Sequence, residues 1–357
     1  MNRDGVSRKD FLATAIGAGL FAGCRSVSDM SSRPEPSMAW SALVHLGMNE
    51  WHETNYQQAW TNLRDPVLAK AVAAQSIAAD HVRFDEDVWR RISEKLLFSG
   101  VNQVVIDLGE AVQYPSHPEL AVRGTWTPDK LRMELCRLRT MGIEPIPKLN
   151  FSATHDIWLG EYHRMLSTRK YYAVVAELIA DVCEMFDSPR FFHLGLDEET
   201  VDFQLQGQRM VVVRQGELWW HDLHFYVREA ERHGARAWVW SDYLRHHERR
   251  DFLRHMPRDV VQSPWWYLGE LDPEKNVPTK ALVALAELGY DVVPCSSTCY
   301  GCPDALPRLV EFCKARFDKN RVLGFQMAPW TQMSDVFERR WAESADQVAL
   351  AKTRWNS

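Results

Sequence analysis

Three consecutive carboxylates follow an apolar stretch in residues 191–201, FFHLGLDEETV. The apolar residues alternate in the manner of a buried strand, so His193 and Asp197 are expected on the same side of it. Glu198 lies beyond the expected strand end, where the chain can turn it toward the same pocket as Asp197. Glu199 is expected in solvent at the start of the next loop. Two carboxyl groups that reach one pocket from different angles can cleave a glycosidic bond.

The elements that position these carboxylates alternate regularly along the chain. Strands are expected in residues 42–49, 101–109, 143–151, 191–198, 235–243, 260–267, 290–298 and 322–330. Helices are expected in residues 85–100, 127–142, 169–186, 216–234, 249–256, 278–288, 303–317 and 336–354. Eight strand–helix pairs predict an α/β fold with a single (β/α)8 TIM barrel over residues 40–357. The alternative, a doubly wound open sheet, usually carries a glycine-rich phosphate loop after its first strand, and none is found there.

Chemically useful residues gather at the expected C-terminal ends of the strands, where such barrels carry their active sites. They are Asp107, His155, Asp197, Glu198, Trp240, Asp242, Trp265, Tyr300 and Trp330. Each one alone is more often a surface residue or an ion-pair partner. Together on one face they indicate a pocket for a sugar, because flat aromatic rings stack on sugars and carboxyl groups cleave the bond between them.

Two further segments bear on this pocket. The long connection from Glu50 to Phe84 carries Trp51, His52, Tyr56 and Trp60, which are expected to wall the pocket. The expected seventh strand ends in PCSST, without a carboxylate. Either a second acid comes from elsewhere in the chain, or the substrate supplies the nucleophile.

These residues resemble glycoside hydrolase family 20, the β-N-acetylhexosaminidases. The family signature His-x-Gly-Gly-Asp-Glu is similar to the stretch from His193 to Glu198, and the third expected strand, GIEPIPKLNFSATH, is similar to that of the family. The chain departs from the family at Leu196 (Gly in the family), at Lys148 and Asn150 (Glu and Asp), and in the first strand, which lacks Asp-x-x-Arg.

The resemblance implies an exported hydrolase that removes terminal β-linked N-acetylhexosamine with retention, using the substrate's own acetamido group as nucleophile. Glu198 would be the general acid/base, and Asp197 would orient the acetamido group. Tyr300, Trp240, Trp265, Trp330 and Asp242 would bind the sugar, Asp107 and His155 would tune Glu198, and Gln332 would stand where a Glu binds outer hydroxyls. Two alternatives are a barrel that binds glycans without cleaving them and a glycosidase of this fold that acts on another sugar. The expected partner is an oligosaccharide or glycoconjugate, with no cofactor and no metal.

The N-terminal residues read as an export signal. SRKDFL resembles a twin-arginine signal, and the apolar run that follows ends at Cys24 in LFAGC, which is similar to a lipoprotein cleavage box. We therefore predict an export signal in residues 1–24, a linker in residues 25–39, and a periplasmic protein or a lipoprotein anchored to the membrane through Cys24. Cleavage without lipidation is the open alternative. The net charge of −6 without a basic stripe disfavours nucleic acid as a partner.

Three of the seven cysteines are closely spaced. Cys295, Cys299 and Cys302 have the C-x3-C-x2-C spacing of a cluster-binding motif, but this motif usually lies early in the chain, with an aromatic residue before the last cysteine. A local disulfide or free thiols is the expected state of these residues.

Overall fold

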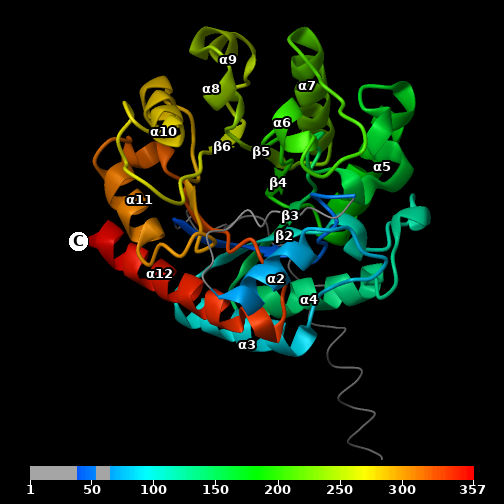
Figure 1. Cartoon of the computed structure of the whole chain (residues 1–357), viewed down its shortest axis with the longest axis horizontal. Coiled ribbons are helices and arrows are strands. Elements are labelled where there is room, and N and C mark those ends of the chain that lie inside the picture. The colour runs from blue at the N-terminus through cyan, green and yellow to red at the C-terminus, as the bar shows by residue number, and fades with distance from the viewer. Residues whose placement is uncertain (1–37, 54–64) are drawn as a thin grey trace, which may run out of the picture. The chain divides into compact units, whose positions relative to one another are not determined.

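The computed structural model describes residues 38–53 and 65–357, which form one compact unit of parallel strands with helices around them (Figure 1). The predicted export signal, Cys24 and almost all of the predicted linker lie outside the described residues. Tyr56 and Trp60 also lie outside them.

The eight strands form one parallel sheet in the order β6-β5-β4-β3-β2-β1-β8-β7. Parallel bridges from Gln262 to Val292 and from Trp265 to Cys295 join the two outer strands, so the sheet closes into a barrel. The strands are β1 (Ala39–His45), β2 (Gln103–Asp107), β3 (Glu144–Lys148), β4 (Phe191–His193), β5 (Arg236–Trp240), β6 (Val261–Ser263), β7 (Cys295–Ser296) and β8 (Gly324–Met327). Every one overlaps a strand expected from the sequence, which confirms the (β/α)8 barrel.

Eight α-helices correspond to the predicted ones. They are α3 (Glu86–Phe98), α4 (Pro128–Thr140), α5 (Arg169–Met185), α7 (Glu217–Arg232), α9 (Arg249–His255), α10 (Val277–Leu288), α11 (Ala305–Lys314) and α12 (Glu338–Asn356). Local capping explains the agreement at their starts: Asp85 accepts from the backbone N–H groups of Asp87 and Val88, and Thr127 accepts from that of Lys130. In the described part of the chain, none of the helices combines the length and apolar character needed to cross a membrane.

Short elements were not expected from the sequence. Three are α-helices: α2 (Pro66–Gln75), α6 (Val201–Gln204) and α8 (Tyr243–His246). Five are 3-10 turns: η1 (Gly109–Ala111), η2 (Pro118–Leu120), η3 (Ile157–Met165), η4 (Lys319–Arg321) and η5 (Asp335–Phe337). All of α2 lies in the connection from Glu50 to Phe84, so this connection is partly helical.

Strand alternation divides the core into two parts. One cluster fills the barrel and includes Leu43, Val105, Phe191 and Trp238. The other lies between the strands and the helices, and Phe192, Leu194 and Leu196 belong to it, as their alternation predicted. The odd-numbered residues of β4 therefore point into the barrel. The strand ends at His193, five residues before the expected end, and the turn that follows brings Asp197 to the C-terminal end of the barrel.

Candidate active site

A tight turn after β4 carries the two carboxylates. Gly195, Leu196 and Glu198 all have positive φ angles, of 73°, 70° and 52°. A Cβ atom on Gly195 would lie 1.8 Å from the Asn150 side chain, so only glycine fits there. Leu196, where the resembled family has a second glycine, adopts the left-handed conformation at a cost of about 1–3 kcal/mol. Such strain is concentrated at functional sites because the surrounding structure has to hold it.

One cavity of about 230 Å³ lies at the C-terminal ends of the strands. Its lining comes from the loops or ends of seven strands: Trp51, His52, Thr154, His155, Asp197, Glu198, Phe203, Gln206, Trp240, Trp265, Tyr267, Cys299, Tyr300 and Trp330. The structure thus brings together seven of the ten predicted site residues, and Trp51 and His52 wall the cavity as expected.

Aromatic rings form much of the wall. The ring centroids of Trp240 and Trp330 are 5.8 Å apart, and Trp265 stacks on Tyr267 at 4.8 Å. The indole N–H groups of Trp240 and Trp330 are buried and donate no hydrogen bond within the described chain. Together the rings offer flat apolar faces to the cavity, which suit a sugar.

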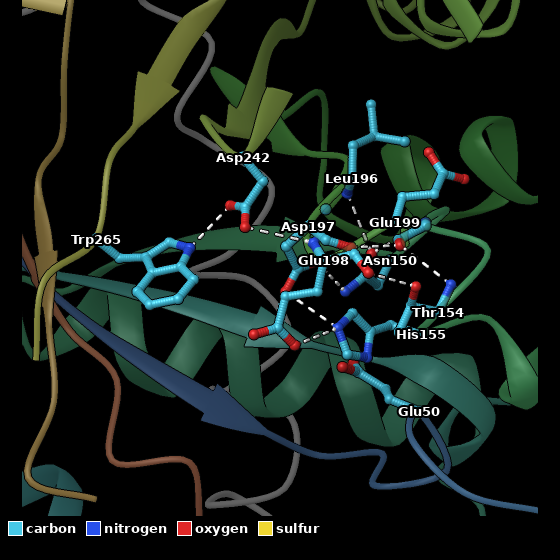
Figure 2. A network of polar contacts seen from close by, with 12 residues as sticks. Glu50, Asn150, Thr154, His155, Leu196, Asp197, Glu198, Glu199, Asp242 and Trp265 are labelled. Atoms are coloured by element: carbon cyan, nitrogen blue, oxygen red, sulfur yellow. Dashed lines mark hydrogen bonds and ion pairs between the residues drawn. The ribbon is translucent and has the colours of Figure 1, made fainter. Parts of the chain in front are cut away.

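Asp197 and Glu198 converge on His155 (Figure 2). The His155 Nε2 atom lies 3.4 Å from Asp197 Oδ2 and 3.3 Å from Glu198 Oε2. Asn150 Nδ2 donates to the other oxygen of Asp197 at 2.9 Å. Burial opposes the charged imidazolium, but the two carboxylates outweigh it and raise the pKa of His155 above its ordinary value. Asp197 is thus held on both oxygens, while Glu198 has one free side toward the cavity.

The raised pKa of His155 predicts a specific pH dependence. The ion pairs of His155 contribute stability that is fully present below about pH 6.5, the unfolded pKa, and is lost as the pH rises through the folded pKa. We expect His155→Asn to cost more unfolding free energy at pH 6 than at pH 9, measured by urea unfolding. We expect Asp197→Asn to lower the pH at which the His155 ring titrates by NMR. Equal costs of His155→Asn at both pH values would contradict this prediction.

Asp242 supports the site without lining the cavity. Its carboxylate accepts from Trp265 Nε1 at 2.8 Å and from the backbone N–H of Glu198 at 3.4 Å, as Figure 2 shows. Burial and the nearby Asp197 and Glu198 raise the pKa of Asp242 to about 6, although Arg245 partly offsets this effect. Asp242 therefore links the aromatic wall to the backbone of the general acid candidate. Direct contact of Asp242 with a sugar stays a prediction.

The expectation for Glu199 was wrong. Its side chain is 8% exposed and pairs with Arg214, and Trp219 Nε1 donates to it at 2.5 Å. In Figure 2 its carboxylate points away from His155. Arg214 also donates to Asp222 at 3.0 Å, so a buried ion-pair network behind the cavity uses the third carboxylate. The sequence could not indicate this, because Arg214 lies 15 residues away.

Asp107 lies in a second buried group of charges. It accepts from Lys148, which also lies 3.4 Å from Glu50, and it lies 3.5 Å from His45. Burial lowers the pKa of His45 to about 4, so this ring is neutral near pH 7. The contacts of Asp107 in the described chain are with these residues, whereas its predicted action on Glu198 has no contact to support it. Lys148 stands at a position where the resembled family has Glu. It therefore gives Asp107 a partner that the resemblance did not imply.

Gln332 also stands away from the cavity lining. Its backbone N–H donates to Gln75 Oε1 at 2.8 Å and its side chain to Ser334 Oγ at 3.1 Å. The Gln75 side chain donates in turn to the carbonyl of Trp330 at 2.9 Å. Helix α2, which was not predicted, therefore holds the backbone that directly follows Trp330, at the Trp330 carbonyl and the Gln332 N–H. Binding of outer hydroxyls by Gln332 has no geometric support.

Sequence reasoning missed several lining residues. Phe203 and Gln206 carried no motif, Thr154 lay in the third expected strand segment without an assigned role, and Tyr267 lay at the end of the sixth expected strand without one. Cys299 lines the cavity, and it is a free thiol like Cys295 and Cys302, which agrees with one of the two expected states. Burial raises the pKa of Cys299 to about 12, so the thiol is not a nucleophile near neutral pH.

Two groups of side chains have the composition of a metal site. In the first, which consists of His45, Glu50 and Asp107, the two carboxylates already pair with the Lys148 ammonium group, a cation supplied by the chain itself. In the second, His155, Asp197 and Glu198 offer one nitrogen and two carboxylate oxygens within 4.8 Å of one another. This second group could bind a divalent cation when His155 is neutral, but the same atoms also suit proton transfer.

The sequence matches no protein-family model and no curated protein. Solved structures do match it. A chitobiase from Flavobacterium johnsoniae aligns with a TM-score of 0.55 and 18% identity, over 78% of this chain and 49% of that one. An exo-β-N-acetylglucosaminidase from Vibrio harveyi, solved with N-acetylglucosamine, aligns with a TM-score of 0.56 and 14% identity, over 90% of this chain and 57% of that one. A β-N-acetylhexosaminidase from Streptomyces coelicolor A3(2) aligns with a TM-score of 0.58 and 11% identity, over 87% of this chain and 64% of that one.

The chain therefore spans about half of the first of these proteins and less than two thirds of the other two. All three structures are named as family 20 glycoside hydrolases, which the sequence motifs also resembled. At these identities the likeness establishes the architecture: this chain folds as a (β/α)8 barrel similar to the barrels of family 20 β-N-acetylhexosaminidases.

Proposed function

We propose that the protein is a glycoside hydrolase that removes terminal β-linked N-acetylhexosamine with retention of anomeric configuration. The observation that carries the proposal is the convergence of Asp197 and Glu198 on His155 inside one aromatic-walled cavity. The names of the similar solved structures support it. The nucleophile in this proposal is the 2-acetamido oxygen of the substrate.

Glu198 would donate a proton to the oxygen that leaves. Its carboxyl group borders the cavity and is the less restrained of the two, because Asn150 holds Asp197. After the sugar has cyclised, the same carboxylate would take a proton from the attacking water. His155 lies beside it and would stabilise the carboxylate form between the two steps.

Asp197 and Tyr300 would hold the acetamido group. The Asp197 carboxylate can accept the amide N–H and stabilise the positive charge of the cyclised intermediate. Burial raises the pKa of Tyr300 to about 12, so its hydroxyl stays protonated and can donate to the amide oxygen. Both residues line the same cavity, which brings the donor and the acceptor to one ligand.

We assign the nucleophile to the substrate because Asp197, the second carboxylate of the lining, is given the role of holding the acetamido group. Among the described residues, Asp197 and Glu198 are the carboxylates that line the cavity, and β7 ends at Ser296, followed by Ser297 and Thr298. An intramolecular nucleophile gains from proximity, with effective molarities of about 10⁵ M or more.

This proposal predicts a strict need for the 2-acetamido group. A substrate with a plain 2-hydroxyl loses the nucleophile and the Asp197 contact together, so we expect it to be cleaved at least about 100-fold more slowly. Matched nitrophenyl β-N-acetylglucosaminide and β-glucoside substrates test this in one assay, and NMR of the first product tests retention. Comparable rates on both, or an inverted product, would refute the mechanism. Binding of the sugars without turnover would instead identify a glycan-binding barrel.

We also propose that the protein is exported and reaches the periplasm or the membrane surface. The support is the N-terminal sequence alone, SRKDFL followed by an apolar run and LFAGC.

A further inference from the structure

A buried cation that is not part of the cavity lining contacts the aromatic wall. Arg245 belongs to the short helix α8, which follows β5, and its side chain is 7% exposed. It is not among the described residues that line the cavity, and the proposed reaction gives it no role. The contacts of a buried guanidinium have to offset its desolvation, so they indicate what it supports.

The guanidinium of Arg245 stacks on the ring of Trp265. Its central carbon lies 3.2 Å from the ring centroid, and its Nη2 group donates to the Trp265 carbonyl at 2.7 Å. The ring of Tyr267 also stacks on Trp265, with the centroids 4.8 Å apart and an interplanar angle of 18°. A guanidinium this close leaves no room for a second ring on the same face, so Arg245 and Tyr267 cover opposite faces of the indole.

The stack continues to the proposed donor to the acetamido group. The ring centroid of Tyr267 lies 6.4 Å from that of Tyr300 and 6.4 Å from that of Trp330, and all three residues line the cavity. Arg245 contacts both the carbonyl of Trp265 and the face of its ring that is opposite Tyr267. It therefore fixes the ring on which the rest of the stack rests.

The same cation lies near the support of the general acid candidate. Arg245 Nη1 lies 3.9 Å from Asp242 Oδ1, the oxygen that accepts from the backbone N–H of Glu198 at 3.4 Å. The other Asp242 oxygen accepts from Trp265 Nε1 at 2.8 Å (Figure 2). The positive charge of Arg245 favours the charged form of the buried Asp242 carboxyl group, which is the stronger hydrogen-bond acceptor.

We propose that Arg245 is a positioning residue of the active site, which fixes Trp265 in the cavity wall for substrate binding and holds Asp242 in place for catalysis by Glu198. The inference rests on the proposed function. The two effects can be separated, because stacking needs the planar guanidinium whereas the effect on Asp242 needs only a positive charge. Lys keeps the charge and loses the planar group, and Met loses both.

The test measures kcat and KM separately on nitrophenyl β-N-acetylglucosaminide. We expect Arg245→Lys to raise KM about tenfold and to leave kcat within about threefold of the wild type. We expect Arg245→Met to raise KM by the same factor and also to lower kcat about tenfold. Arg249→Met is the matched control. Arg249 is 44% exposed, pairs with Glu287 and is outside the cavity lining, so both constants should stay within about twofold of the wild type.

A double variant tests whether the effect on KM passes through Trp265. In Trp265→Leu there is no ring for the guanidinium to stack on, so adding Arg245→Lys should raise KM less than about twofold further. Urea unfolding identifies any variant that has lost its fold, and Arg245→Lys alone still tests the wall if Arg245→Met does not fold. A purely structural role would lower the unfolding midpoint without separating KM from kcat.

Three results would overturn the proposal. The first is an unchanged KM in Arg245→Lys, the second is an equal loss of kcat in Arg245→Lys and Arg245→Met, and the third is a tenfold rise of KM on the Trp265→Leu background. If the wild type cleaves no substrate, the proposed function fails. Calorimetric binding of N-acetylglucosamine to the wild type and to Arg245→Lys then decides the role of Arg245 in the wall, where a tenfold loss of affinity supports it and unchanged affinity counts against it.

Discussion

Replacement of Glu198 by Gln is expected to lower kcat by about 10²–10⁴-fold, the usual value of general acid–base catalysis. Gln has the same shape but cannot transfer a proton to the leaving oxygen. The loss should be largest for a disaccharide, whose leaving alcohol is poor, and smaller for a nitrophenyl substrate, whose leaving group needs little help. Steady-state rates on both substrates measure this, and thermal unfolding checks that the fold is intact.

The matched control is Asp202→Asn. Asp202 is an exposed carboxylate four residues further along, in α6, so its loss tests the effect of a nearby negative charge alone. We expect it to retain activity within about twofold of the wild type, as is usual for surface substitutions. Near wild-type turnover of the disaccharide by Glu198→Gln would show that another residue is the acid.

Replacement of Arg214 by Met is expected to lower the free energy of unfolding by about 3–5 kcal/mol. The guanidinium is 1% exposed and pairs with Glu199 and with Asp222. It also donates to the Tyr226 hydroxyl at 2.6 Å and to the Phe151 carbonyl at 3.1 Å. Met fills a similar volume but leaves two buried carboxylates without their cation.

Urea unfolding followed by tryptophan fluorescence measures this change, with Arg132→Met as the control. Arg132 is 43% exposed and lies 3.4 Å from Asp129 and from Glu184, so its loss should cost less than about 1 kcal/mol. Similar midpoints for the two variants would show that the buried network contributes no more than a surface ion pair.

The fold was predictable because its signals are local. Alternation along residues 191–197 placed Phe192, Leu194 and Leu196 against the helices, and the structure confirms this. Helix starts such as Asp85 and Thr127-Pro128 are read from three or four neighbouring residues. Because the C-terminal strand ends of a barrel share one rim, the same reasoning brought His155, Asp197, Glu198 and the tryptophans to one cavity.

The partners of buried charges were not predictable, since they depend on residues far apart in the chain. Lys148 forms an ion pair with Asp107 of a neighbouring strand, and Arg214 forms one with Glu199 across the loop that follows β4. A cation has to offset the desolvation of a buried carboxylate. The fold decides which cation lies close enough, and the periodicity of the sequence does not indicate which residue this is.

By itself, the sequence predicted the barrel and placed the carboxylates of Asp197 and Glu198 at its C-terminal rim, although it extended every strand two to five residues beyond its observed end. Only the tertiary structure decided that Glu199 pairs with Arg214 and that Phe203 and Gln206 are exposed residues of the cavity lining. The physical reason is that periodicity and capping act over a few residues, whereas burial and exposure are set by contacts between segments such as Gly207 and His52, which lie far apart along the chain.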